Sequence, residues 1–175
     1  MSLLTLLDLS AAFDTIDHDI LFHRLEHAFG IQNSAFAFFR SYLTKRKQMV
    51  SISGYSSTPS TLLHGVPQGS VLGPILFLLY TQTLSQIIDR HSVSHSEFAD
   101  DSKLYNSIPR EQLDYLLSNM QSCVDDVKLW MTQNKLRLNE GKTEALLIDP
   151  QTHQTFHSQS KSVKMLFVFQ DQSGI

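Results

Sequence analysis

Apolar positions in the first part of the chain follow a strand pattern and then two helical patterns. Residues 3–9 form a short apolar run that contains one charge, Asp8, which predicts a buried strand with this aspartate near its end. Residues 18–30 carry apolar side chains at helical spacing and finish at Gly30, a residue type that often follows a helix C-terminus. We expect a second helix to begin at Asn33.

Turn-forming residues divide the next segment into a hairpin, a loop and a helix. Residues 48–53 and 57–63 predict two strands around the turn "GYSS". The Gly- and Pro-rich stretch "GVPQGSVLGP" predicts a loop that leads into an apolar helix over about residues 74–90, with Pro74 in its first turn.

The segment that follows alternates between strand and helix patterns. Phe98, Leu104 and Tyr105 flank two aspartates in "EFADDSKLY", which predicts a β-hairpin with the carboxylates at its tip. After Pro109, apolar residues recur at steps of three and four, and this spacing predicts a long amphipathic helix. "KTEALLID" predicts one more strand.

This order of elements predicts an α+β fold, an antiparallel sheet with helices packed on one face. We assign residues 1–150 to that domain. After Pro150 the composition shifts to Gln, Ser, His and Thr, so we expect residues 151–175 to be a tail of uncertain order, with residues 163–169 as a strand candidate.

Composition limits the function classes. The 175 residues are 42% hydrophobic with a net charge of −3, which is typical of a globular domain and argues against unaided binding of nucleic acid. One cysteine, Cys123, fits a reducing compartment. The longest apolar run, residues 71–80, is too short to cross a bilayer, and no signal peptide pattern is present. We therefore expect an intracellular protein, nuclear or cytoplasmic, with no membrane partner.

Two pairs of adjacent aspartates have different contexts. Asp125 and Asp126 lie on the predicted amphipathic helix, where both can face water, so they need no function. Asp100 and Asp101 lie at a hairpin tip, where two carboxylates held close together favour a bound cation. Oxygen ligands select Mg²⁺ or Mn²⁺, and a third carboxylate, for which Asp8 is the best candidate, would complete a site for two ions.

Histidines four residues apart are a weaker signal. His23 and His27 share that spacing on a predicted helix, but without an HExxH pattern and among polar neighbours they are interpreted as surface residues.

Four blocks in order resemble one family. "LDLSAAFDTIDHDIL", "GVPQGSVLGPILFLLY", "FADDSKLY" and "LRLNEGKTEALLI" are together similar to the palm of the reverse transcriptases of non-long-terminal-repeat (LINE-type) retrotransposons. The resemblance covers residues 3 to about 150. It implies a polymerase palm whose fingers and thumb are largely missing, acting as an RNA-directed DNA polymerase, a nucleotidyltransferase that uses two Mg²⁺ or Mn²⁺ ions. The implied partners are an RNA template, a DNA primer and deoxynucleoside triphosphates.

The resemblance also implies roles by position for the acidic residues. Asp8, Asp100 and Asp101 match the catalytic aspartates, which also bind the metal ions, and the backbone carbonyl of Leu9 would complete one metal shell. Phe98 stands where the family usually has tyrosine, which keeps the ring and loses the hydroxyl.

Four other residues match positions that contact the incoming nucleotide. Phe13 matches the ring that leaves no room for a ribose 2′-hydroxyl, although by itself it reads as a core phenylalanine. Gln68 matches a glutamine against the nucleotide and template, and Gly69 lets the backbone approach the substrate. Lys142 matches a lysine near the triphosphate, although a lysine before a strand is usually only solvated.

Three interpretations stay open. The missing fingers and thumb argue against activity of this segment on its own, unless a longer chain supplies them. The second interpretation is a catalytically inactive relic or a nucleic-acid-binding module derived from a retrotransposon. The third is another two-metal palm enzyme such as a nucleotide cyclase, against which "VPQG" and Phe13 argue, because a cyclase needs no template contact.

Overall fold

The computed structural model describes residues 1–98, 101–149 and 154–159, and the chain divides into two compact units. The first, called the sheet unit below, comprises Met1–Ser10 and Thr83–Ile175. The second, called the helical unit, comprises Ala11–Gln82.

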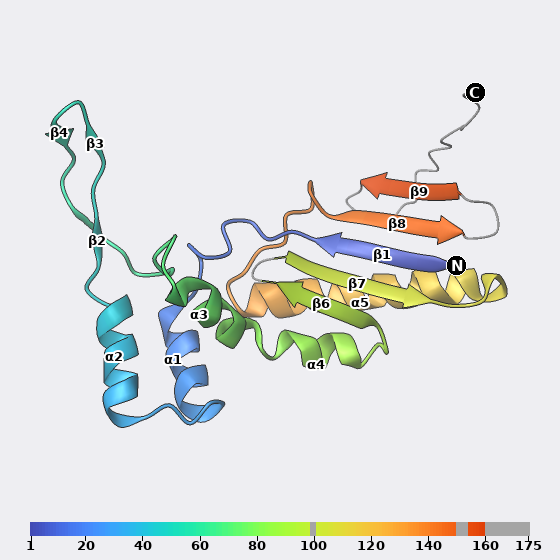
Figure 1. Cartoon of the computed structure of the whole chain (residues 1–175), viewed down its shortest axis with the longest axis horizontal. Coiled ribbons are helices and arrows are strands. Elements are labelled where there is room, and N and C mark those ends of the chain that lie inside the picture. The colour runs from blue at the N-terminus through green and yellow to red at the C-terminus, as the bar shows by residue number, and fades with distance from the viewer. Residues whose placement is uncertain (99–100, 150–153, 160–175) are drawn as a thin grey trace. The chain divides into compact units, whose positions relative to one another are not determined.

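The sheet unit is built on an antiparallel sheet. In the described residues it has five strands in the order β6-β7-β1-β8-β9, and each neighbouring pair is antiparallel (Figure 1). The first strand along the chain, β1, is therefore central, with β7 on one side and β8 on the other. The strands are β1 (Ser2–Leu7), β6 (Ser94–Phe98), β7 (Asp101–Ser107), β8 (Glu144–Asp149) and β9 (Gln154–Gln159).

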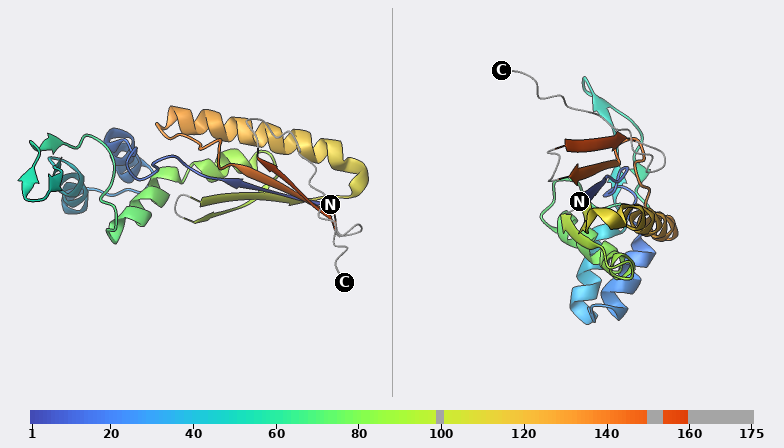
Figure 2. Two further views of the ribbon diagram at one scale, coloured as in Figure 1. Left: turned by 90° about the horizontal axis from the view of Figure 1, so that it is seen from above. Right: turned by 90° about the vertical axis from the view of Figure 1, so that its right-hand side faces the viewer.

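One face of this sheet packs against helices. The long helix α5 (Leu113–Gln133) runs along that face, and α4 (Leu84–Asp89) packs against α5 and β6 (Figure 2). A short 3₁₀ helix, η1 (Arg110–Gln112), precedes α5. Alternate strand residues and one stripe of α5 are buried together: Leu3, Leu7, Leu104, Ala145, Leu147, Leu116, Met120, Val124, Val127 and Met131. The expected antiparallel sheet with helices on one face is confirmed.

The helical unit contains three helices and a long hairpin. Helix α1 (His18–His27) packs against α2 (Asn33–Leu43) and α3 (Leu72–Thr81). Its core holds Leu21, Leu25, Leu43, Leu76, Phe77 and Tyr80. In the hairpin, β2 (Lys47–Gln48) pairs with β5 (Ser60–Thr61), and β3 (Ser51–Ile52) pairs with β4 (Tyr55–Ser56).

The hairpin turn differs from the prediction by two residues. The turn lies at Ser53 and Gly54, because Ile52 pairs directly with Tyr55, and Tyr55 and Ser56 of the predicted turn belong to strand β4. Ser53 has φ 50° and Gly54 has φ 85°, and the tight two-residue turn that matches strand twist needs positive φ at both positions.

The helix expected over residues 74–90 is two helices, α3 and α4. Gln82 and Thr83 separate them, and the Thr83 hydroxyl accepts a hydrogen bond from the Trp130 indole at 3.2 Å. A tertiary contact therefore supports the break.

Strand β9 lies in the range that was expected to be a tail. It pairs with β8 along its whole length, from Asp149↔Gln154 to Glu144↔Gln159. An edge strand is held mainly by main-chain hydrogen bonds, so a polar sequence can form it without the alternating pattern of a buried strand. The strand candidate at residues 163–169 lies outside the described residues.

A turn and a loop that are distant in sequence are joined inside the helical unit. Gly65 N donates to Ile16 O at 2.8 Å, and Val66 N donates to Phe13 O at 2.9 Å. Gly65 has φ +82°, and a Cβ there would lie 2.9 Å from the Asp14 carbonyl oxygen. Glycine is therefore required at this contact, both for its φ and for the space.

We predict that Gly65→Ala lowers the free energy of unfolding by about 3 kcal/mol. The added Cβ would clash with the backbone of Asp14, and alanine also disfavours the positive φ at this position. Gly69→Ala is the matched control, because Gly69 has φ +71° but nothing lies within 4 Å of an added Cβ. We expect this variant to lower the free energy of unfolding by only about 1–2 kcal/mol. Urea unfolding measures both, and equal losses would contradict the proposed clash.

The cysteine gives a second test of the fold. Cys123 is buried on α5, and burial, assisted by the negative charge of Asp126, raises the pKa of its thiol to about 11. About one thiol in a thousand is then ionised at pH 8, so a disulfide reagent should label the native protein at least about a hundredfold more slowly than the urea-unfolded protein. Labelling at comparable rates would show that this face of α5 is not packed.

Candidate active site

Asp8 and Asp101 lie at the same end of two adjacent strands. Leu7 pairs with Ser102 across β1 and β7, and both side chains are buried toward the helices. Asp8 directly follows Leu7 at the end of β1, and Asp101 directly precedes Ser102 at the start of β7, so the two aspartates lie at the same end of this strand pair. Because neighbouring residues of a strand point to opposite faces, we expect both side chains on the face away from the helices.

The third aspartate of the predicted set, Asp100, lies outside the described residues, between β6 and β7. Phe98 pairs with Asp101, which confirms the expected hairpin. Within the described ranges, no group of three or more His, Cys, Asp or Glu side chains could hold a metal ion.

Backbone pairing on the other side of β1 fixes the segment after Asp8. Leu9 forms an antiparallel bridge with Leu138. The two hydrogen bonds of this bridge come from its flanks, Asn139 N to Asp8 O at 2.8 Å and Ser10 N to Arg137 O at 2.9 Å. The carbonyl of Leu9 itself therefore points away from Leu138.

The Asp8 carboxylate is incompletely paired. Its Oδ2 atom is buried and has no hydrogen-bond partner in the described part of the chain. The Lys142 Nζ atom lies 3.8 Å from Oδ2, within the range of an ion pair but too far for a hydrogen bond. A buried carboxylate oxygen without a donor fits a site for a cation.

The loop that carries Lys142 is a closed turn. The Asn139 carbonyl accepts hydrogen bonds from Lys142 N at 3.1 Å and from Thr143 N at 3.0 Å. The Thr143 hydroxyl donates to the same carbonyl at 3.0 Å. This turn presents the Lys142 side chain to Asp8, a contact that the sequence did not predict.

The other three predicted nucleotide contacts belong to the helical unit. Phe13 is half-buried, and its ring packs on Phe77 with centroids 5.1 Å apart. The Gln68 amide nitrogen lies 2.9 Å from both carboxylate oxygens of Asp14. Gly69 is exposed, so its backbone is open to approach. The turn–loop hydrogen bonds described above thus place Phe13 and Gln68 on joined segments.

Two acidic residues were missed by the sequence analysis. Asp14 orients the Gln68 amide, and only its position beside Phe13 could have drawn attention to it. Glu97 is half-buried in β6, paired with Ser102, and its Oε1 atom has no hydrogen-bond partner among the described residues. Burial raises the pKa of the Glu97 carboxyl; nearby His95 lowers it and Asp89 raises it.

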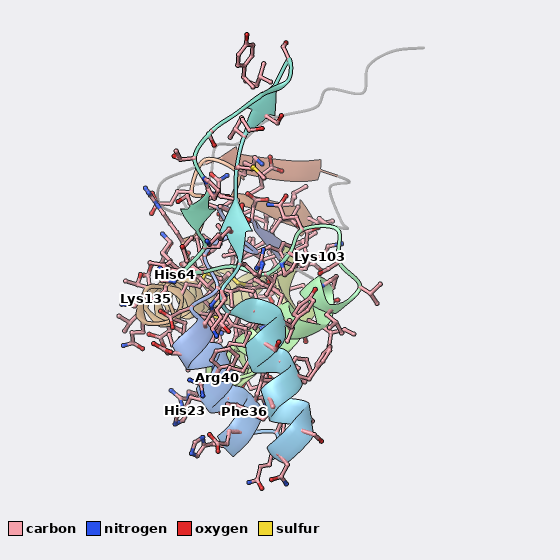
Figure 3. The ribbon with its side chains drawn as sticks, turned by 90° about the vertical axis from the view of Figure 1, so that its left-hand side faces the viewer. His23, Phe36, Arg40, His64, Lys103 and Lys135 are labelled. Carbon is pink, nitrogen blue, oxygen red and sulfur yellow. The ribbon has the colours of Figure 1, made fainter. Side chains whose placement is uncertain are left out.

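The expectation that His23 and His27 are surface residues agrees with the structure. Both are exposed, and their rings stack with centroids 4.3 Å apart on α1 (Figure 3). No helix in the described residues combines the length and apolar character needed to cross a membrane.

Comparison with known proteins gives consistent matches. The family model described as "Reverse transcriptase (RNA-dependent DNA polymerase)" matches residues 2–168, beyond the boundary expected at residue 150. The RNA-directed DNA polymerase from the mobile element jockey of Drosophila melanogaster is 30% identical over 141 residues. The probable RNA-directed DNA polymerase from transposon BS of the same species is 29% identical over 143 residues. In each case the match covers 78% of this chain and 15% of the relative.

Solved structures share the fold. A telomerase from Candida tropicalis, truncated from its C-terminal domain, gives a TM-score of 0.61 at 16% identity, covering 95% of this chain and 33% of the telomerase chain. A telomerase from Candida albicans, in complex with a fragment of telomeric RNA, gives 0.63 at 14% identity, covering 91% and 29% of the two chains. At this identity the likeness shows the fold alone, and it agrees with a polymerase palm. The family match over most of its length shows that this chain belongs to the reverse transcriptases and is similar to those of LINE-type retrotransposons.

Proposed function

We propose that this segment adds deoxynucleotides to a DNA primer on an RNA template, as part of a retrotransposon reverse transcriptase. In that reaction the primer 3′-oxygen bonds to the α-phosphorus of a deoxynucleoside triphosphate, the bond from that phosphorus to the bridging oxygen breaks, and pyrophosphate leaves. The observation that supports the proposal is the buried Oδ2 atom of Asp8, which lacks a hydrogen-bond donor among the described residues and belongs to the residue that directly follows β1, at the end where Asp101 begins the paired strand β7.

The residues that would hold the divalent cations are Asp8, Asp101 and the matched Asp100, with the Leu9 carbonyl. Mg²⁺ or Mn²⁺, when bound, would activate the primer hydroxyl and offset charge on the leaving oxygen. Carboxylates supply the hard oxygen ligands that these ions select, and the Leu9 carbonyl is not used by its bridge to Leu138.

The other proposed roles concern the nucleotide. Phe13 would leave no room for a 2′-hydroxyl, Gln68 would lie against the nucleotide, and Gly69 would let the backbone approach it. Lys142 would offset triphosphate charge or protonate the leaving pyrophosphate. Its 3.8 Å distance from Asp8 supports a role beside the carboxylates rather than in solvent.

Asp14 would act as a positioning residue. Because both its carboxylate oxygens hold the Gln68 amide nitrogen, the amide oxygen of Gln68 is left to face a substrate.

We predict that Asp8→Asn weakens Mn²⁺ binding at least tenfold, because one charged ligand is lost. Titration followed by electron paramagnetic resonance measures this without any activity. Asp125→Asn is the control, since it removes the same charge from the exposed face of α5 and should leave binding unchanged. Equal affinity in the wild type and Asp8→Asn would contradict the metal site.

Primer extension on an RNA template with Mg²⁺ or Mn²⁺ tests the reaction itself. Extension that is lost in Asp8→Asn and in Asp100→Asn, but kept in Asp125→Asn, supports the proposal. Mn²⁺ binding through Asp8 without any extension would instead favour the second candidate, a catalytically inactive relic.

For Asp14→Asn we predict a KM for the deoxynucleotide about tenfold higher with little change in kcat, because the released Gln68 amide is less well placed. Steady-state primer extension measures both constants. Asp19→Asn, an exposed carboxylate in the first turn of α1, is the matched control. An unchanged KM in Asp14→Asn would contradict the proposal that Asp14 positions the Gln68 amide.

A further inference from the structure

A polar cavity of about 440 Å³ lies entirely within the sheet unit. Lys128 and Thr132 of α5 form one wall, the loop of residues 137–141 forms another, and Ser10 completes it. Its volume is in the range of small-molecule sites, and Leu138 is the one apolar side chain among its lining residues. The cavity therefore suits a compact polar ligand.

The charges in this cavity favour an anion. Arg137 is exposed, and no ion pair of its guanidinium is found in the described part of the chain. Lys128 has one carboxylate near it, with its Nζ atom 3.7 Å from Oε1 of Glu140. Glu140 is half-exposed, so it can turn outward and leave Lys128 to another anion. Two cations thus face one replaceable carboxylate.

Backbone donors add to these cations. In the turn closed by the Asn139 carbonyl, the hydrogen bonds begin at Lys142 N, so the N–H groups of Glu140 and Gly141 have no acceptor within the turn. Arginine, lysine and backbone N–H groups together are the groups that recognise phosphate oxygens.

The cavity shares its loop with the candidate active site. Asn139, which lines the cavity, donates its N–H to the Asp8 carbonyl, and Lys142, which follows Gly141, is paired with the Asp8 carboxylate. Ser10, also in the lining, is two residues after Asp8. The cavity, which α5 walls on the helix side of the sheet, is thus connected to the candidate active site through this loop.

We propose that this cavity binds a compact polyphosphate anion, and that its ligand is the pyrophosphate released by the reaction. The identity of the ligand rests on the proposed function. The anion would take the place of Glu140 as the partner of Lys128 and would bind Arg137 through two oxygens, a geometry that suits guanidinium.

Calorimetric titration with sodium pyrophosphate, in EDTA and without divalent cations, tests the proposal on the whole chain. Arg137→Gln should weaken binding about tenfold or more, because it removes the unpaired cation. Glu140→Gln should tighten binding severalfold, because it removes the competing carboxylate. Lys135→Gln is the matched control: Lys135 is exposed in the same connection, outside the cavity lining, and should change binding less than twofold (Figure 3).

Each other result overturns the proposal. Equal weakening in Arg137→Gln and Lys135→Gln would indicate that pyrophosphate binds to the net charge alone. Unchanged or weaker binding in Glu140→Gln would contradict the proposal that the anion replaces Glu140 as the partner of Lys128. Inorganic phosphate that binds as tightly as pyrophosphate would exclude a diphosphate site. A short oligothymidylate that binds through Arg137 and is not displaced by pyrophosphate would assign the cavity to a nucleic acid backbone.

This titration is independent of the proposed metal site, because no divalent cation is present. Arg137→Gln should lose pyrophosphate affinity while keeping Mn²⁺ affinity within about twofold. Failure of the anion site would thus leave the metal result unchanged, and failure of the metal site would leave the anion result unchanged. Thermal unfolding of every variant in the same buffer confirms that each is folded.

Discussion

The pairing of β1 with strands on both sides is the constraint on which the candidate site depends. β7 fixes one edge of β1 and β8 fixes the other, and the bridge between Leu9 and Leu138 extends the pairing past Asp8. A slip of one residue would turn Asp8 toward the helices and Leu7 toward water. The buried row of Leu3, Thr5 and Leu7 prevents that slip, so the packing of the core also sets the direction of the carboxylate.

The same strand pairing holds carboxyl groups in positions where they are incompletely hydrogen-bonded. Asp8 and Asp101 lie at one end of two adjacent strands, one oxygen of Asp8 is buried without a donor among the described residues, and Lys142 lies 3.8 Å from that oxygen, too far for a hydrogen bond. Glu97 on β6 is a second carboxyl with a buried oxygen that lacks a hydrogen-bond partner among the described residues, and burial raises its pKa. Native structures rarely leave such groups unsatisfied, and those that do often reserve them for a ligand. The paired strands supply the folding free energy that offsets the cost of these unsatisfied carboxyl groups.

In the helical unit, backbone hydrogen bonds join a turn to a loop that is distant in sequence. Its turn at Phe13–Ile16 and its loop at Gly65–Val66 are joined by main-chain contacts that only glycine at position 65 allows. His18 Nε2 and Arg46 both hydrogen-bond the Gly65 carbonyl, at 2.8 and 3.1 Å, so side chains from α1 and from the connection before β2 hold the loop. Phe13 and Gln68 owe their placement to this loop rather than to helix packing. Loop residues so restrained can present a substrate contact with little disorder.

The sequence by itself determined the strands and helices that carry buried stripes, because local periodicity is a property of neighbouring residues. The order of its motifs showed the family resemblance, and the roles that this resemblance implies for the aspartates, Phe13 and Gln68 stay predictions. The sequence also separated Asp100–Asp101 from Asp125–Asp126 by context. Only the tertiary structure decided the break at Thr83, the pairing of β9, the ion pair of Lys142 with Asp8 and the hold of Asp14 on Gln68. Each of these joins residues that are distant in sequence or paired only through the backbone. The stabilisation that these interactions give depends on tertiary contacts, which no local sequence pattern encodes.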